Sequence, residues 1–311
     1  MINKHIIPTV PVLIASSSDA ISDNTQNYLT SNSEHISQDN QPFINILSNY
    51  PLWISLESKL ESENLKDRAR EVKQELLDLM NNNPTFSSLV TRIKEYDDVL
   101  LIHSINITCL SLMIGLTLEF AISDLFDLAI AALFCNIGFT STSKDDFKYF
   151  LKHKKNNHEL IKNHIETYSE MTIDSPLLRK KKIVYGILDH HEYYNGTGSP
   201  SGKQGEEISL FGRILLIAHS YDELVGGYNY TTGLHPLEAL KVIFENKDNH
   251  FDRNILNIFM YRTTYFKLGE IINLPLGRKG KIVGFDDYIK NPHLPIIKLQ
   301  SGATINLRTL D

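Results

Sequence analysis

The sequence predicts a mainly α-helical protein with a small β-sheet at its C-terminal end. Apolar residues recur with helical spacing from about residue 51 to residue 264. From residue 267 onward, short apolar runs alternate with turn residues, as in strands. The 311 residues are 42% hydrophobic and 22% charged, so the chain can bury a sizeable core. These observations favour a soluble helical domain with a small β appendage.

The N-terminal region, residues 1–95, is expected to be partly flexible and then helical. Residues 16–41 are rich in Ser, Asn, Asp and Gln and lack apolar periodicity, which is typical of a linker or a surface loop. From Pro51, apolar residues with helical spacing predict an amphipathic helix that ends at the Asn-Asn-Asn-Pro of residues 81–84. This helical part could pack on the next domain, form a homodimer, or do both.

Residues 96–265 predict a bundle of successive helices, because long apolar segments are separated by short polar ones. The main predicted helices cover residues 100–118, 125–133, 147–171, 182–189 and 213–224. Residues 266–311 predict a β-meander, since four short runs are separated by turn signals. The predicted strands cover residues 269–274, 280–285, 294–299 and 303–307.

Charge and cysteine content exclude several classes of function. A net charge of -6 gives no general attraction to DNA or to an anionic membrane. Cys109 and Cys135 lie in apolar helical patterns, which argues for a reduced, cytoplasmic chain without a disulfide framework. The apolar run near the N-terminus is too short to span a bilayer and is a poor secretory signal.

Residues 190–200, His-His-Glu-Tyr-Tyr-Asn-Gly-Thr-Gly-Ser-Pro, carry the strongest functional signal. Two adjacent imidazoles close a helical run, and two glycines and a proline then break it. A bare His-His pair favours two solvated histidines at a helix end. The Gly-x-Gly-x-Pro that follows shifts the interpretation toward a metal or phosphate site.

This segment resembles the signature of the HD-GYP family, bacterial metal-dependent hydrolases of cyclic di-GMP, which runs His-His-Glu-x-x-Asp-Gly-x-Gly-Tyr-Pro. Asn195 stands in the Asp position and Ser199 in the Tyr position. Further similarities lie at residues 205–224 and 250–252, so the resemblance covers about two-thirds of the chain, from His103 to the C-terminus. It implies a helical bundle of the HD superfamily, and some members of the family carry a similar β tail.

The resemblance also implies a metal centre of imidazoles and carboxylates. Four of its imidazole positions remain, and two further positions hold a cysteine and a histidine that are themselves competent ligands. The candidate ligands are His103, Cys135, His153, His190, His191 and His219. The candidate site would hold either one divalent ion of Fe, Mn or Zn, or no metal. We assign no catalytic residue and no substrate-binding residue.

Three departures from the family pattern bear on activity. The family's His-Asp followed by Ile-Gly-Lys is here Cys-Asn-Ile-Gly-Phe at residues 135–139. The neutral Asn136 cannot bridge two cations as a carboxylate does, and Phe139 removes a cation that would help to hold a phosphate. The family's Arg-Pro-Tyr-Arg falls on residues 228–231, Tyr-Asn-Tyr-Thr, which lack both guanidinium groups.

Other residues have plainer interpretations. His158, His164 and the basic run at residues 179–182 are expected on solvated faces. Glu192 would either orient an imidazole or lie exposed at a helix end. Asp222 is expected to cap or brace a helix.

The sequence therefore leaves three functional hypotheses. The leading one is a degenerate HD-GYP protein with little or no hydrolytic activity, acting as a signalling or interaction module whose partners are cyclic di-GMP and a protein. The first alternative is an active metal-dependent phosphodiesterase of cyclic di-GMP or a related nucleotide, with a rebuilt His/Cys centre. The second is a metal-free structural partner protein. Whether the chain is an enzyme stays open at this point.

Overall fold

The computed structural model describes most of the chain from residue 62 onward. The described residues are 56–57, 60, 62–153, 158–226, 233–234, 236–246, 250–263, 269, 271–274, 278–285 and 295–307. The predicted linker at 16–41 and the Tyr-Asn-Tyr-Thr of residues 228–231 lie outside them. The chain divides into two compact units, one of residues 20–256 and one of residues 1–19 and 257–311. The three-region division proposed from the sequence stays a prediction.

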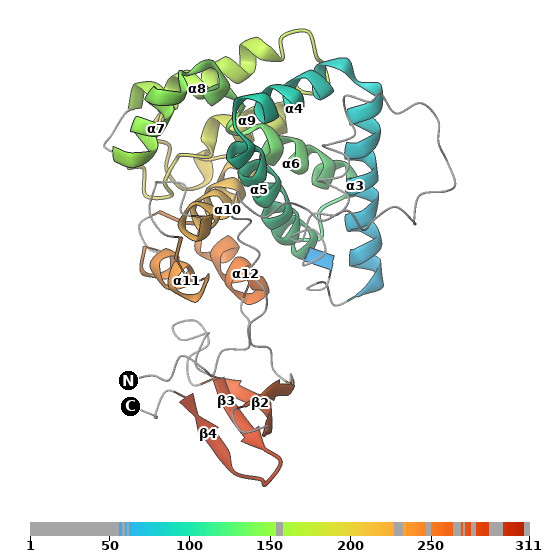
Figure 1. The fold of residues 1–311 in the computed structure, drawn as a ribbon, viewed down its shortest axis with the longest axis vertical. Coiled ribbons are helices and arrows are strands. Elements are labelled where there is room, and N and C mark those ends of the chain that lie inside the picture. Colours follow the sequence, from blue (N-terminus) through green and yellow to red (C-terminus); the bar gives the residue numbers. More distant parts are fainter. Residues whose placement is uncertain are drawn as a thin grey trace. The chain divides into compact units, whose positions relative to one another are not determined.

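The described part of the chain is mainly helical, as the sequence predicted (Figure 1). The helices are α3 (Glu63–Asn82), α4 (Pro84–Tyr96), α5 (Asp98–Thr117), α6 (Ile122–Phe134), α7 (Lys144–His153), α8 (His158–Met171), α9 (Lys181–Asp189), α10 (Leu210–Gly226), α11 (Pro236–Glu245) and α12 (Arg253–Thr263). The single helix predicted at 147–171 is represented by α7 and α8, and residues 154–157 between them are not described.

Polar caps set the starts of α3 and α4. The Ser62 side chain accepts a hydrogen bond from the Leu65 amide at the start of α3. The Asn83 side chain accepts from the Phe86 amide, and Pro84 occupies the first turn of α4. Since proline favours the start of a helix over its interior, α3 ends at the predicted break and α4 begins there.

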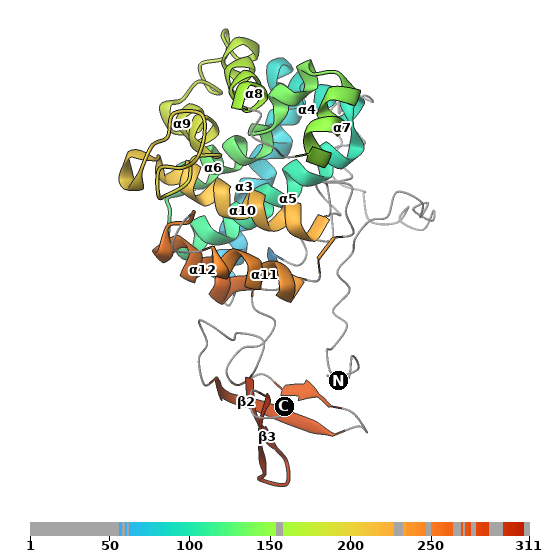
Figure 2. The same cartoon turned by 90° about the vertical axis from the view of Figure 1, so that its left-hand side faces the viewer.

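The core of the helical unit lies among α5, α6, α9 and α10, which pack on one another (Figures 1 and 2). Segments Asp98–Thr117 and Ile122–Ser141 are long and apolar enough to cross a membrane by composition alone. In the fold, 83% and 78% of their apolar windows are buried. Their apolar character is therefore explained by packing inside the helical unit.

The C-terminal strands form the predicted antiparallel meander. The strands β1 (Ile271–Asn273), β2 (Lys279–Phe285), β3 (Pro295–Leu299) and β4 (Thr304–Asn306) pair in chain order. A register shift between Ile282 and Gly284 marks an irregularity in β2. One face of the sheet buries an apolar cluster, whose members are Ile272, Leu274, Ile282 and Ile297.

Candidate metal centre

Three histidines form the candidate metal centre. His164, His190 and His191 each place one ring nitrogen within 4.8 Å of the others. His164 lies on α8, whereas His190 and His191 directly follow α9. His164 and His190 are almost completely buried, with exposed fractions of 1% and 0%. Among the described residues, no other group of three or more potential ligands converges in this way.

Backbone carbonyls fix the tautomers of the two buried imidazoles. His190 Nδ1 lies 2.6 Å from the Ile187 carbonyl oxygen, and His164 Nδ1 lies 3.3 Å from that of Leu160. A carbonyl oxygen only accepts, so each Nδ1 carries the proton and donates. Each Nε2 therefore presents a lone pair. Both Nε2 atoms are buried and have no hydrogen-bond partner in the structure.

Burial keeps these imidazoles neutral near pH 7. Desolvation lowers the pKa of His190 from 6.5 to about 4. Desolvation, and next to it the neighbouring His190, hold the pKa of His164 well below 6.5. Because a metal binds only the unprotonated ring nitrogen, low pKa values remove the competition from protons.

Two further histidines extend the cluster on α5 and α10. The ring of His219 lies 5.6 Å from that of His190 and 5.2 Å from that of His191, between ring centroids. The ring of His103 lies 4.8 Å from that of His219. Asp222 Oδ2 accepts a hydrogen bond of 2.6 Å from His103 Nδ1, so the His103 Nε2 carries the lone pair.

Asp222 therefore has a clear structural task. Besides His103, it accepts a 2.7 Å hydrogen bond from the Asn106 side chain at its second oxygen. It thus orients an imidazole of α5 from a position on α10, one turn beyond His219. Asp222 thus braces α5 against α10, which is the kind of role expected for it from the sequence.

Glycines bring the segments of the site into close contact. A Cβ atom added to Gly138 would lie 1.7 Å from the His164 carbonyl oxygen, so the turn after α6 contacts the backbone of α8 directly. A Cβ added to Gly212 would lie 2.5 Å from Asp189 Cβ, next to His190. Larger residues at either position would push α8 or the end of α9 away from the cluster.

The turn after α6 presents an unusual buried amide. The Asn136 side chain is 1% exposed, and neither its oxygen nor its nitrogen has a hydrogen-bond partner in the structure. Two residues on, Gly138 contacts His164. Buried amides without partners are rare and indicate an ion or water that satisfies them. The turn after α6 therefore buries a neutral amide, whose oxygen is a potential metal ligand, near α8.

Phe139 covers the face of His164. The two rings are stacked at 4.0 Å between centroids with an interplanar angle of 9°, and Phe147 lies 4.8 Å from Phe139 on another side. In the family pattern a lysine stands at the position of Phe139. The aromatic ring supplies packing for His164 in place of a cation for phosphate.

The loop that follows the histidine pair is held by two buried carboxylates. Glu192 accepts hydrogen bonds from the amides of Ser201 and Lys203, at 2.6 and 3.2 Å. Asp189 accepts from the Lys203 side chain at 2.5 Å and from the Ser209 amide at 2.8 Å. These bonds fasten residues 201–209 back onto the end of α9, which holds His190 and His191 in place.

The structure brings together part of the predicted ligand set. His190 and His191 belong to the three-histidine group, and His103 and His219 pack beside it. The Cys135 thiol donates to the Ala132 carbonyl oxygen, and burial raises its pKa to about 12, which disfavours the thiolate that binds metals. The side chain of His153 lies outside the described residues, so its role as a ligand stays a prediction.

His164 is the residue that the sequence analysis placed wrongly. A solvated face was expected because Lys and Asn surround it, yet its side chain is buried and lies in the cluster. A usable signal was present in the sequence. Leu160, Ile165 and Tyr168 share the helical face of His164, at spacings of one and four residues, so the histidine continues an apolar stripe.

One other expectation is also corrected. Glu192 is fully buried because two backbone amides bind its carboxylate, so the exposed position considered for it is wrong. The basic run at 179–182 is exposed, as expected, and its side chains also make contacts on the surface. Lys180 pairs with Asp127, Lys182 with Asp124, Arg179 donates to the Ser169 carbonyl, and Lys181 lies over the Tyr185 ring.

The donor set fits one divalent transition metal. Three neutral imidazoles suit zinc or iron better than manganese, which prefers oxygen ligands, and such sites leave further positions open. The two buried Nε2 atoms without partners are the observation that supports this fit. His164, His190 and His191 would hold the ion.

The chain matches a family model and is similar in sequence to several curated proteins. A family model described as HD domain matches residues 44–255. A cyclic di-GMP phosphodiesterase of Pseudomonas aeruginosa is 23% identical over 224 residues, which cover 72% of this chain and 53% of that protein. The cyclic di-GMP phosphodiesterase PdeB of Borreliella burgdorferi is 25% identical over 208 residues, which cover 66% and 54%. The chain thus spans about half the length of these curated relatives.

Two solved structures are also similar. A cyclic GMP-AMP-specific phosphodiesterase of Vibrio cholerae matches with a TM-score of 0.42 and 22% identity, over 55% of this chain and 46% of that one. An HDG"Y"P protein of Bdellovibrio bacteriovorus matches with a TM-score of 0.43 and 17% identity, over 73% of each chain.

Proposed function

The chain belongs to the HD domain family, and on that premise we propose that it binds one divalent metal through His164, His190 and His191 and hydrolyses cyclic di-GMP little or not at all. Its role is that of a binding or interaction module in cytoplasmic signalling. Cyclic di-GMP is the candidate ligand because relatives in Pseudomonas aeruginosa and Borreliella burgdorferi are phosphodiesterases of this dinucleotide.

One observation carries this proposal. Among the described residues, the group of potential metal ligands is His164, His190 and His191, and it contains no carboxylate. Two divalent ions about 4 Å apart repel by roughly 16 kcal/mol at an effective dielectric constant of about 20, and an anionic bridge must offset that repulsion. The turn after α6 offers only the neutral amide of Asn136. One ion bound by neutral imidazoles avoids the repulsion.

The same turn weakens recognition of the reacting phosphate. Phe139 packs on His164 where the family pattern has a lysine. Without that cation, charge that develops on a phosphoryl oxygen in the transition state lacks one source of stabilisation. Weak hydrolysis therefore follows from two changes in one turn, at Asn136 and at Phe139.

The test is an incubation of the reduced protein with cyclic di-GMP and supplied manganese or iron(II), followed by chromatography of linear dinucleotide and GMP. We expect no product above that of a His190→Ala/His191→Ala protein. His250→Ala is the matched control, because His250 stacks on Tyr193 outside the three-histidine group. Product that forms with the native protein and the His250 variant, and disappears in the double variant, would contradict the proposal.

One observation favours a second candidate, a phosphodiesterase with a single metal. A three-histidine site leaves open positions, and a divalent metal bound there supplies Lewis acidity toward a phosphoryl oxygen. Asp222 holds His103 with its lone pair on Nε2, where a proton can be accepted. Under this alternative, His103→Gln would remove turnover while metal binding persists; turnover that survives the change would exclude it.

A further inference from the structure

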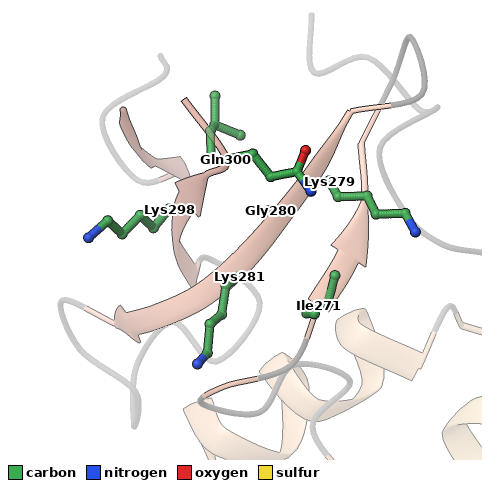
Figure 3. A pocket seen from close by; sticks show the side chains of 7 residues that line it. Ile271, Lys279, Gly280, Lys281, Lys298 and Gln300 are labelled. Carbon is green, nitrogen blue, oxygen red and sulfur yellow. The ribbon is translucent and has the colours of Figure 1, made fainter. Parts of the chain in front are cut away.

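The solvent face of the C-terminal sheet is basic and partly apolar. Strand pairing places Ile271, Lys281, Lys298 and Thr304 in one row across the four strands, and paired residues point to the same face. Lys279 lies two residues before Lys281 on that face. Figure 3 shows the hollow there, which is lined by Ile271, Lys279, Gly280, Lys281, Lys298, Leu299 and Gln300.

The lysines on this face repel one another. Lys281 lies directly opposite Lys298 on the neighbouring strand, and like charges in that position destabilise a sheet. The described residues of 269–307 include four basic side chains and no acidic one, and the acidic residues of this stretch, Glu270, Asp286 and Asp287, lie outside the described residues. On the paired strands the charged side chains described are all basic, in a chain whose net charge is -6. A negatively charged partner would relieve the repulsion.

Aliphatic side chains stand beside the lysines. Ile271 is 67% exposed and Val283 is 44% exposed, although both lie in strands. The opposite face buries Ile272, Ile282 and Ile297, so the sheet already has its own core there. Exposed aliphatic groups next to a charged row favour a partner that offers both carboxylates and apolar side chains.

We propose that this face binds an extended acidic segment of a partner protein, in which carboxylates and aliphatic residues occupy every second position and so share one side. Side chains two residues apart in a strand lie roughly 6.6 Å apart on one face. Lys279 and Lys281 have this spacing, so alternate carboxylates of an extended segment can meet successive lysines. The residues between these carboxylates point away from the sheet, so the aliphatic residues that contact Ile271 and Val283 lie further along the same side of the segment.

A protein segment fits this face better than a nucleic acid does. Single-stranded nucleic acid sites combine a basic groove with aromatic side chains on which bases stack. The residues that line the hollow include two aliphatic side chains and no aromatic one. Aliphatic groups offer little to a base, whereas they pack well against valine or leucine of a peptide.

The experiment titrates the full chain, at low and moderate salt, with a labelled peptide that carries glutamates and valines at every second position and serines between them. We expect binding that weakens with salt. A peptide of the same composition with its glutamates in one block should bind more weakly. The variant Lys281→Glu/Lys298→Glu places two glutamates opposite each other, so the cross-strand repulsion keeps its magnitude and the sheet keeps its stability. Its affinity for the acidic peptide should fall by about tenfold or more. Lys148→Glu/Lys241→Glu makes the same charge change on exposed lysines of α7 and α11 and should leave affinity unchanged.

The single change Lys281→Glu separates binding from stability. It places opposite charges at positions 281 and 298, which should stabilise the sheet by about 0.2–1 kcal/mol, yet it should weaken binding of the peptide. Ile271→Ser/Val283→Ser should lower affinity without changing its salt dependence. Three outcomes would overturn the proposal: no binding by the native chain, equal binding by the double reversal, or tighter binding of an oligothymidine at the same lysines.

Discussion

Replacement of Gly138 by alanine tests how the turn after α6 positions the candidate metal centre. The added Cβ would lie 1.7 Å from the His164 carbonyl oxygen, 2.4 Å from its carbonyl carbon and 2.6 Å from its Cα. All three atoms belong to the backbone, so no side-chain rotation relieves the overlap. To restore a separation of 3.0 Å, the two segments must part by roughly 1.3 Å, the difference between 3.0 and 1.7 Å.

That displacement should be visible in both stability and metal binding. Overpacking of this kind costs about 1–3 kcal/mol of unfolding free energy, and the backbone contact favours the upper end. Because His164 moves with its backbone, affinity for a divalent metal should fall about 10- to 100-fold. Denaturant unfolding of the metal-free protein measures the first quantity, and a competitive titration with zinc measures the second.

The control for this substitution is Gly115→Ala. Its added Cβ would approach Leu125 and Leu128 at 3.0 Å, but both contacts are with the ends of flexible side chains. The gain in helix propensity of about 1 kcal/mol offsets much of the crowding, and the metal site is untouched. If Gly138→Ala binds zinc as tightly as Gly115→Ala does, the account of how His164 is positioned fails.

Three further predictions concern the cluster. Asn136→Asp should destabilise the metal-free protein by burying a charge and should strengthen metal binding, yet combined with Cys135→His it should not restore hydrolysis of cyclic di-GMP, which chromatography checks. The pKa of His190 is lowered to about 4 by burial, so the unfolded chain binds more protons below pH 6.5. Stability of the metal-free protein should therefore be lost as pH falls from 6.5 toward 4, and denaturant unfolding of His190→Gln should show a shallower loss. Asp222→Asn should weaken zinc affinity by less than His164→Ala does, because Asp222 orients His103 and does not belong to the three-histidine group; equal losses in a titration would contradict this.

The fold was largely predictable because its signals are local. The apolar runs at 100–118 and 125–133 became α5 and α6, and the alternating segments after residue 267 became the four paired strands. Helix breaks followed proline and asparagine, as at Asn83 and Pro84. The resemblance to the HD-GYP family, read from residues 190–200, is confirmed by the family match and by relatives that are cyclic di-GMP phosphodiesterases.

The site was only partly predictable because it depends on contacts between distant segments. The histidine pair is adjacent in sequence, so it was found. The apolar stripe on α8 indicates that His164 is buried, but no local pattern encodes the approach of α8 to Gly138 that brings it to the pair. The burial of Glu192 depends likewise on amides nine and eleven residues away. Residue type and spacing predicted the kind of chemistry, and tertiary packing selected the residues.

The most direct test of the account is the metal content of the purified chain after reconstitution. The native protein, loaded with manganese, iron(II) or zinc and freed of excess ion, would be measured by elemental mass spectrometry beside His164→Ala. We predict one ion per native chain and a clear loss in His164→Ala, while Asn136→Asp retains at least one. Two ions per native chain, or one ion that His164→Ala retains unchanged, would contradict a single-metal centre built on His164, His190 and His191.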